Sequence, residues 1–151
     1  MNIGICNDHR GFLLKQKLIK ELQNKGYNII DCGTDSNSSV DYPDYAFKLG
    51  ELLTKKEADF GIAICGTGIG ISIACNKVKG IRCAKVDNCS DAKLSRLHND
   101  ANIMAINGKM TFIRAKKIVD IFLKTKFSNE NRHITRLNKI KSYEEKIKNE
   151  Q

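Results

Sequence analysis

The sequence predicts an α/β domain with three layers, αβα, built on a Rossmann-like five-stranded parallel sheet and ending in a C-terminal helix. Two observations predict this fold. Short apolar runs rich in β-branched residues alternate with longer amphipathic segments, and the runs are continuously apolar, as in strands that helices cover on both faces. The expected strands are residues 2–6, 27–32, 59–65, 81–86 and 102–106. A chain of 151 residues fits a single domain, residues 1–151.

The helices are expected between and after these strands. Leucines recur at i, i+4 and i+8 in residues 11–25, and Gly26 is suited to end that helix. A second helix begins near Pro43, a residue favoured in the first helical turn. Its expected buried residues are Ala46, Leu49, Leu52 and Leu53. Further helices are expected at about 70–78, 90–98, 111–124 and 132–148.

Composition and charge exclude several classes of protein. No apolar run approaches the roughly 20 residues of a membrane span, and the start at Met1 lacks the pattern of a secretory signal, so we expect a cytoplasmic protein without a membrane partner. The net charge is +9, but only Phe127 and Tyr143 are interleaved with the basic residues of 124–151. Nucleic acid is therefore not an expected partner.

The six cysteines form no C-x-x-C pair, and the chain has only three histidines. We expect no metal site, and five of the cysteines are expected to be small buried apolar residues. Cys65 differs because it ends an expected strand and opens the glycine-rich stretch Cys65-Gly66-Thr67-Gly68-Ile69-Gly70-Ile71-Ser72. Amides of such a loop approach anions closely and would stabilise a thiolate. Cys65 is thus a nucleophile, a base or merely the last residue of the strand.

Ligands of doubly wound α/β domains bind outside the carboxyl ends of the strands, so we expect the functional side chains there. The first strand is followed by the motif Asn7-Asp8-His9-Arg10-Gly11. This motif is equally consistent with a cap of the next helix and with a functional site. His98, at the end of a helix, is either stabilised by the helix dipole or an acid/base group. Arg132 and Arg136 are spaced i, i+4 on one face of the last helix. They either bind a phosphate group or form part of a charged, solvent-exposed surface.

Taken together, these stretches resemble the ribose-5-phosphate isomerase B family, which includes allose-6-phosphate and galactose-6-phosphate isomerases. The resemblance runs nearly end to end. Its segments are Asp8-His9, Gly11-Phe12, Asp41-Tyr42-Pro43, Cys65 to Ser72, Ala74, Asn76-Lys77, Gly80-Ile81-Arg82, Ser95-Arg96, His98-Asn99-Asp100 and Arg132-His133.

The resemblance implies an enzyme without a cofactor that interconverts ribose 5-phosphate and ribulose 5-phosphate through an enediolate, in the non-oxidative branch of the pentose phosphate pathway. It implies a homodimer, with a tetramer as the alternative, whose active sites are shared and whose helix at about 132–148 packs on the partner. The implied catalytic residues are Cys65 as base, Thr67 at the reacting oxygens and His98 for ring opening. The implied substrate-binding residues are Asp8, His9, Tyr42, Gly66, Gly68, Ile69, Gly70, Asn99, Lys109, Arg132 and Arg136.

One position departs from the family, which often has arginine where this chain has Lys109. A lysine keeps the charge and loses the two-pronged geometry of a guanidinium. Two other functions stay open. The first is an isomerase of the same family whose substrate is a six-carbon sugar phosphate, such as allose or galactose 6-phosphate. The second is a non-catalytic sensor that binds a sugar phosphate or a nucleotide.

Overall fold

A computed structural model describes residues 1–149 of the chain and the side chains of residues 1–147. Within residues 1–149 it contains one sheet of five parallel strands in the order β2-β1-β3-β5-β4. The strands are β1 (Asn2–Asn7), β2 (Asn28–Asp31), β3 (Phe60–Cys65), β4 (Cys83–Lys85) and β5 (Ile103–Asn107). The predicted parallel sheet is confirmed, with each strand close to its expected position.

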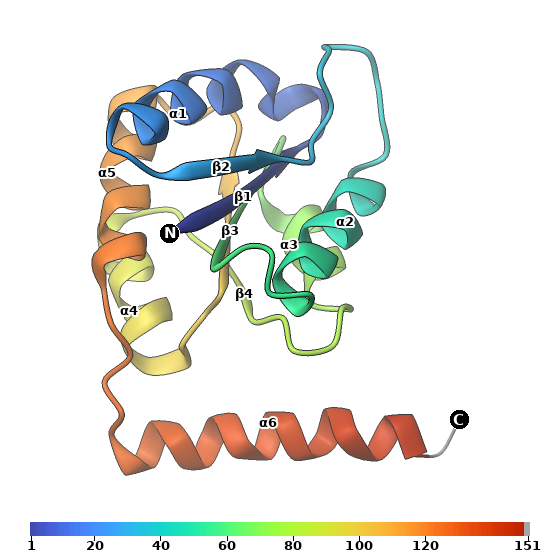
Figure 1. Cartoon of the computed structure of the whole chain (residues 1–151), viewed down its shortest axis with the longest axis vertical. Coiled ribbons are helices and arrows are strands. Elements are labelled where there is room, and N and C mark those ends of the chain that lie inside the picture. Colours follow the sequence, from blue (N-terminus) through green and yellow to red (C-terminus); the bar gives the residue numbers. More distant parts are fainter. Residues whose placement is uncertain (150–151) are drawn as a thin grey trace.

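Helices cover both faces of the sheet (Figure 1). One face carries α1 (Phe12–Asn24), α4 (Cys89–Asn99) and α5 (Phe112–Lys124). The other carries α2 (Tyr42–Thr54) and α3 (Ile69–Cys75). A short 3-10 helix, η1 (His9–Gly11), follows β1, and α6 (Asn131–Asn149) ends the described chain. The three-layer αβα prediction is therefore confirmed, including the C-terminal helix.

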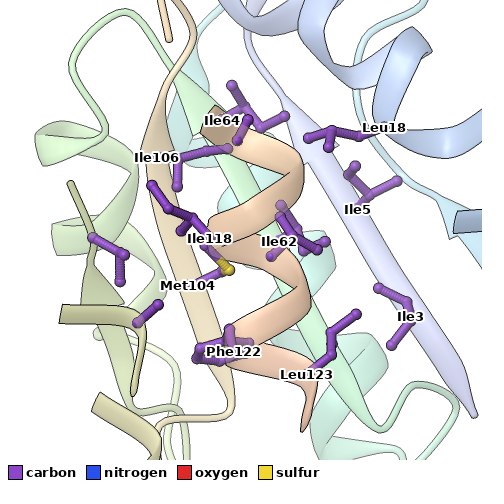
Figure 2. Packing of buried hydrophobic residues seen from close by; sticks show 14 of the residues in the cluster. Ile3, Ile5, Leu18, Ile62, Ile64, Met104, Ile106, Ile118, Phe122 and Leu123 are labelled. Carbon is purple, nitrogen blue, oxygen red and sulfur yellow. The ribbon is translucent and has the colours of Figure 1, made fainter. Parts of the chain in front are cut away.

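The two faces of the sheet differ in side-chain size. Large residues of β1, β3 and β5 pack against α1 and α5, as Figure 2 shows for Ile5, Ile62 and Met104. Apart from Ile103, the alternate positions that face α2 and α3 are small. They include Gly4, Cys6, Gly61, Ala63, Cys65 and Ala105. A Cβ on Gly4 would lie 2.6 Å from Leu49 Cδ1, so the small residues let α2 lie close to the sheet.

Two sequence signals for the helix ends are confirmed. Gly26 follows α1 with φ +86°, a conformation that favours glycine, and its N–H donates to Gln23 O. Pro43 lies in the first turn of α2. Burial at the sheet edges is weaker than expected from the apolar runs, because β2 and β4 each have only one neighbouring strand and are half-buried or exposed. Leu52 and Leu53 are likewise only half-buried.

The carboxyl and amino edges of the sheet carry different elements. Cys65 ends β3 at the carboxyl edge, where its carbonyl accepts from the Gly108 N–H that follows β5. At the amino edge, the Gly80 N–H before β4 donates to the Glu144 carboxylate of α6, with an N to Oε2 distance of 3.2 Å. Thus α6 runs along the end of the domain opposite to Cys65 (Figure 1). No helix within residues 1–149 is long and apolar enough to cross a membrane.

Candidate active site

Cys65 is the central residue of the candidate site. Its side chain is only 4% exposed and lies on the α2 and α3 face of the sheet. The Gly68 N–H donates to Cys65 Sγ across 3.2 Å. Such a donor stabilises a thiolate more than a thiol, because the sulfur then carries the negative charge. Cys65 is thus one of the expected site residues that the structure places at the carboxyl edge.

The prediction that the remaining five cysteines are buried is confirmed for Cys6 and Cys75, whereas Cys32, Cys83 and Cys89 are only half-buried. Within residues 1–149 all six are free thiols. Burial, reinforced by a hydrogen bond with Cys32, raises the pKa of the Cys6 thiol well above its usual value. The pKa of Cys83 is also raised, first by its hydrogen bond with Cys75 and then by burial. The thiols of Cys6 and Cys83 therefore stay protonated at neutral pH.

The glycine loop between β3 and α3 wraps around the sulfur. Gly68 adopts φ +78°, which favours glycine and turns its N–H toward Cys65. Thr67 is exposed, and its Oγ1 accepts from the Ile69 N–H at 3.1 Å, so its hydroxyl proton is free to donate outward. Since α3 has only seven residues, the loop amides rather than a long helix supply the donors for an anion.

Asp8 and His9 follow β1 beside this loop. Asp8 is 6% exposed and caps η1, because its Oδ1 accepts from Arg10 N at 2.9 Å and Gly11 N at 3.2 Å. The structure thus shows the capping role. His9 Nδ1 accepts from the Val40 N–H at 3.3 Å, which leaves the proton of a neutral imidazole on Nε2. Nε2 is therefore available to donate to a ligand.

Tyr42 begins α2 and packs directly on the glycine loop. A Cβ on Gly70 would lie 2.7 Å from Tyr42 Cζ and 2.9 Å from its hydroxyl oxygen, so the ring occupies the space beside that glycine.

The loop before Tyr42 is anchored by Lys15 of α1, which is 1% exposed. Lys15 Nζ lies 2.8 Å from the Asp31 carboxylate and donates to Thr34 O at 2.7 Å.

Lys109 also lies at the carboxyl edge, just after β5. It is exposed, and its backbone N–H donates to Asn107 Oδ1 at 2.7 Å. A cavity of about 190 Å³ lies here, lined by Asp87, Asn107, Lys109, Met110 and Arg114. A larger cavity, of about 1000 Å³, lies between α4 and α5, away from Cys65. Neither of these two cavities is lined by Cys65 or by the glycine loop.

His98 and Asn99 do not lie at the carboxyl edge beside Cys65 in this chain, although functional side chains are expected mainly at that edge. They end α4, which runs antiparallel to the strands and returns the chain to the amino edge of the sheet. Asp100, which follows them, binds Arg82 just before β4. Since a strand rises about 3.3 Å per residue, the two edges are roughly 13–17 Å apart.

The residues of α6 join His98 at this opposite edge. His133 is 3% exposed and stacks on His98, with ring centroids 4.3 Å apart and planes inclined by 15°. Arg132 and Arg136 are exposed on the same helix, and Arg132 Nε donates to the Glu130 carboxylate at 2.8 Å. The candidate residues thus form two groups, one around Cys65 and one around His98.

Sequence reasoning missed three residues beside the Cys65 group. Arg10 lies against Gly66, Lys15 anchors the loop that leads to Tyr42, and Asn107 holds the backbone of Lys109. A signal existed only for Arg10, which stands inside the motif after β1. The contacts of Lys15 join α1 to a segment more distant in the sequence, whereas Asn107 contacts a residue only two positions away.

Comparisons with known proteins identify the chain, by its sequence and fold, as an α/β sugar isomerase. The family model described as Ribose/Galactose Isomerase matches residues 3–140, and the chain belongs to that family. Ribose-5-phosphate isomerase B of Escherichia coli is 41% identical over 140 residues, which cover 92% of this chain and 93% of that protein.

Solved structures show the same fold. Ribose-5-phosphate isomerase B of Clostridium thermocellum superposes with a TM-score of 0.94 at 49% identity, covering 97% of this chain and 99% of that one. The Mycoplasma genitalium enzyme, solved with bound ribulose 5-phosphate, gives a TM-score of 0.89 at 39% identity, covering 95% and 96% of the two chains. The chain is therefore a sugar-phosphate isomerase in fold and family.

Proposed function

We propose that this chain interconverts ribose 5-phosphate and ribulose 5-phosphate, with Cys65 as the base. The observation that carries the proposal is a buried sulfur at the end of β3 that accepts an N–H from the glycine loop. Relatives named as ribose-5-phosphate isomerase B match nearly the whole chain, which supports the same substrate. One of them was solved with ribulose 5-phosphate bound.

In the proposed reaction, Cys65 moves one proton between adjacent carbons. The thiolate removes the proton from C2 of the open-chain aldose, the C2 electron pair forms the C1–C2 double bond, and the carbonyl oxygen O1 becomes the oxyanion of an enediolate. Transfer of a proton from the O2 hydroxyl to O1 moves the negative charge to O2. Collapse to the C2 carbonyl then takes the proton from the thiol back onto C1. A single base that reaches both carbons suffices.

The glycine loop stabilises the charge that develops on the oxygens. The Gly68 N–H already donates to the Cys65 sulfur. The backbone N–H groups of Gly66 and Gly70 are fixed by the fold, so they need no rearrangement as the enediolate forms. Thr67 keeps a hydroxyl proton for the reacting oxygens because its own oxygen already accepts from Ile69. Tyr42 and Asp8 border the loop and would orient sugar hydroxyls.

We also propose that a second copy of the chain completes each site. His98, Asn99, Arg132 and Arg136 are expected to act on the sugar ring and on the phosphate, yet they lie at the edge opposite to Cys65. In a two-fold dimer, the Cys65 group of each subunit would lie beside the His98 group of its partner. Apolar side chains of α6 support this, because Ile140 is 50% exposed and Ile147 is 44% exposed in one chain.

The proposal is tested by incubating purified protein with ribose 5-phosphate in D₂O and following ribulose 5-phosphate and deuterium by NMR. We expect turnover with deuterium entering C1 of the ketose, since the base exchanges its proton with solvent. Cys65→Ala should lower kcat by about 10²-fold or more while inorganic phosphate still binds. A variant with more than about a tenth of wild-type turnover would show that another base acts.

The same assay separates the remaining substrates. Allose 6-phosphate and galactose 6-phosphate, supplied in parallel, report on a pocket that accepts six-carbon sugars. A protein that binds these phosphates and turns over none of them would instead be a sensor.

A further inference from the structure

Arg10 lies across the glycine loop at the residue that follows the proposed base. A Cβ on Gly66 would come within 2.8 Å of Arg10 Cδ, 3.5 Å of Nη1 and 3.7 Å of Nε. The arginine side chain therefore occupies the space that any larger residue at position 66 would fill. Its guanidinium lies next to the loop that is proposed to bind the substrate.

The backbone of Arg10 is fixed at the same junction. Its N–H donates to Asp8 Oδ1 at 2.9 Å, and a Cβ on Gly108 would lie 2.6 Å from its carbonyl oxygen. Gly108 in turn donates its N–H to Cys65 O at 2.8 Å and precedes Lys109. Arg10, the base and Lys109 are thus held together by short contacts between three loops.

The guanidinium of Arg10 is not paired with a carboxylate in the described part of the chain. Arg82, Arg96 and Arg132 each form an ion pair with a carboxylate, whereas Arg10 forms none within residues 1–149 and its guanidinium makes no hydrogen bond there. It is also exposed. A fixed stem thus presents five unused N–H donors at the rim of the site.

We propose that Arg10 binds the phosphate of the substrate and supplies the planar, two-pronged contact that Lys109 cannot make. This proposal rests on the proposed isomerase function. Phosphate is the favoured ligand because Arg10 is exposed at the rim, where the dianionic end of the sugar would lie, while the enediolate forms at the buried Cys65 sulfur. His9, the preceding residue, offers Nε2 to the same anion. A guanidinium binds two phosphate oxygens at once, and an ammonium acts as a point charge.

The test measures kcat and KM for ribose 5-phosphate and the inhibition constant of inorganic phosphate in Arg10→Gln and Arg10→Lys. In Arg10→Gln we expect KM and the inhibition constant to rise together by about tenfold or more, with kcat within about twofold of wild type. Arg10→Lys should recover only part of the loss. Lys17→Gln is the control, since it removes one positive charge from the exposed side of α1, away from the glycine loop. We expect that control to leave all three constants unchanged.

Unchanged KM and inhibition constants in Arg10→Gln would overturn the proposal. A fall in kcat at a constant inhibition constant would also overturn it, since the contact would then be to the enediolate. Calorimetric titration with inorganic phosphate separates this proposal from the proposed function because it requires no turnover. If the wild type is inactive but binds phosphate more tightly than Arg10→Gln, the isomerase proposal alone fails. If the wild type is active and both proteins bind phosphate equally, the Arg10 proposal alone fails.

Discussion

The imidazole rings of His98 and His133 stack nearly parallel, with centroids 4.3 Å apart, and join the end of α4 to the start of α6. His133 is buried, and its Nε2 has no hydrogen-bond partner within residues 1–149. The nearest carboxylate oxygen, on Glu130, is 4.0 Å away. The contact therefore packs well only while His133 is neutral.

The free energy of unfolding should consequently decrease as the pH is lowered through the range in which His133 titrates. Burial lowers the pKa of His133, and the charges of His98, Arg132 and Arg136 lower it further, while Glu130 opposes the shift. With a folded pKa below the unfolded value of about 6.5, the unfolded state binds more protons, so stability is complete above that value and is lost as pH falls through the folded pKa.

The measurement is the free energy of unfolding by urea at pH 7.5 and pH 5.5, in wild type and in His133→Phe. Phenylalanine keeps an aromatic ring against His98 and removes the titrating group. We expect a smaller loss of stability at pH 5.5 in the variant than in wild type. Equal losses in the two proteins would show that His133 does not contribute to the pH dependence.

Lys15→Met should destabilise the fold and loosen the loop that leads to Tyr42. The substitution keeps the apolar stem and removes the bonds to Asp31 and Thr34. Because hydrogen bonds of charged groups contribute about 1.5–3 kcal/mol, we expect a loss of that size in the free energy of unfolding. Lys17→Met on the exposed side of α1 is the control, with a change within about 0.5 kcal/mol. A Lys15→Met protein as stable as the control would contradict the proposed anchoring.

Gly70→Ala should impair the site through Tyr42. The new methyl group would come within 2.7 Å of the tyrosine ring, which must then move off the loop. We expect kcat/KM to fall by about tenfold, and Tyr42→Ala in the Gly70→Ala background to cost much less than Tyr42→Ala alone, since contacting residues are not additive. Additive losses from the two substitutions would mean that Tyr42 and Gly70 act separately.

The sequence predicts the strands and the Cys65 loop well because their signals are local. Apolar runs of a parallel strand and a glycine-rich turn that follows a cysteine can be recognised within ten residues. Burial at the edges is predicted less well, since the apolar run of β2 does not reveal that it has one neighbour. The Lys15 anchor could not be predicted, because it joins α1 to residues 31 and 34 across β2.

The position of His98 shows a different limit. The sequence identifies it as a candidate, but the direction of α4 decides at which edge of the sheet it lies. A helix that follows a parallel strand runs back toward the amino edge, so its last residues lie far from the carboxyl ends. The expected roles of Cys65 and His98 are therefore compatible only if two chains contribute to one site.

Mixing two inactive variants tests this shared site most directly. Cys65→Ala and His98→Asn subunits, each inactive alone, are unfolded together in equal amounts, refolded and assayed with ribose 5-phosphate. If sites are shared, each heterodimer has one intact site, and random pairing restores roughly a quarter of wild-type activity on two-fold symmetry grounds. A mixture that stays as inactive as its parents, although heterodimers are detected by mass spectrometry, would contradict the account.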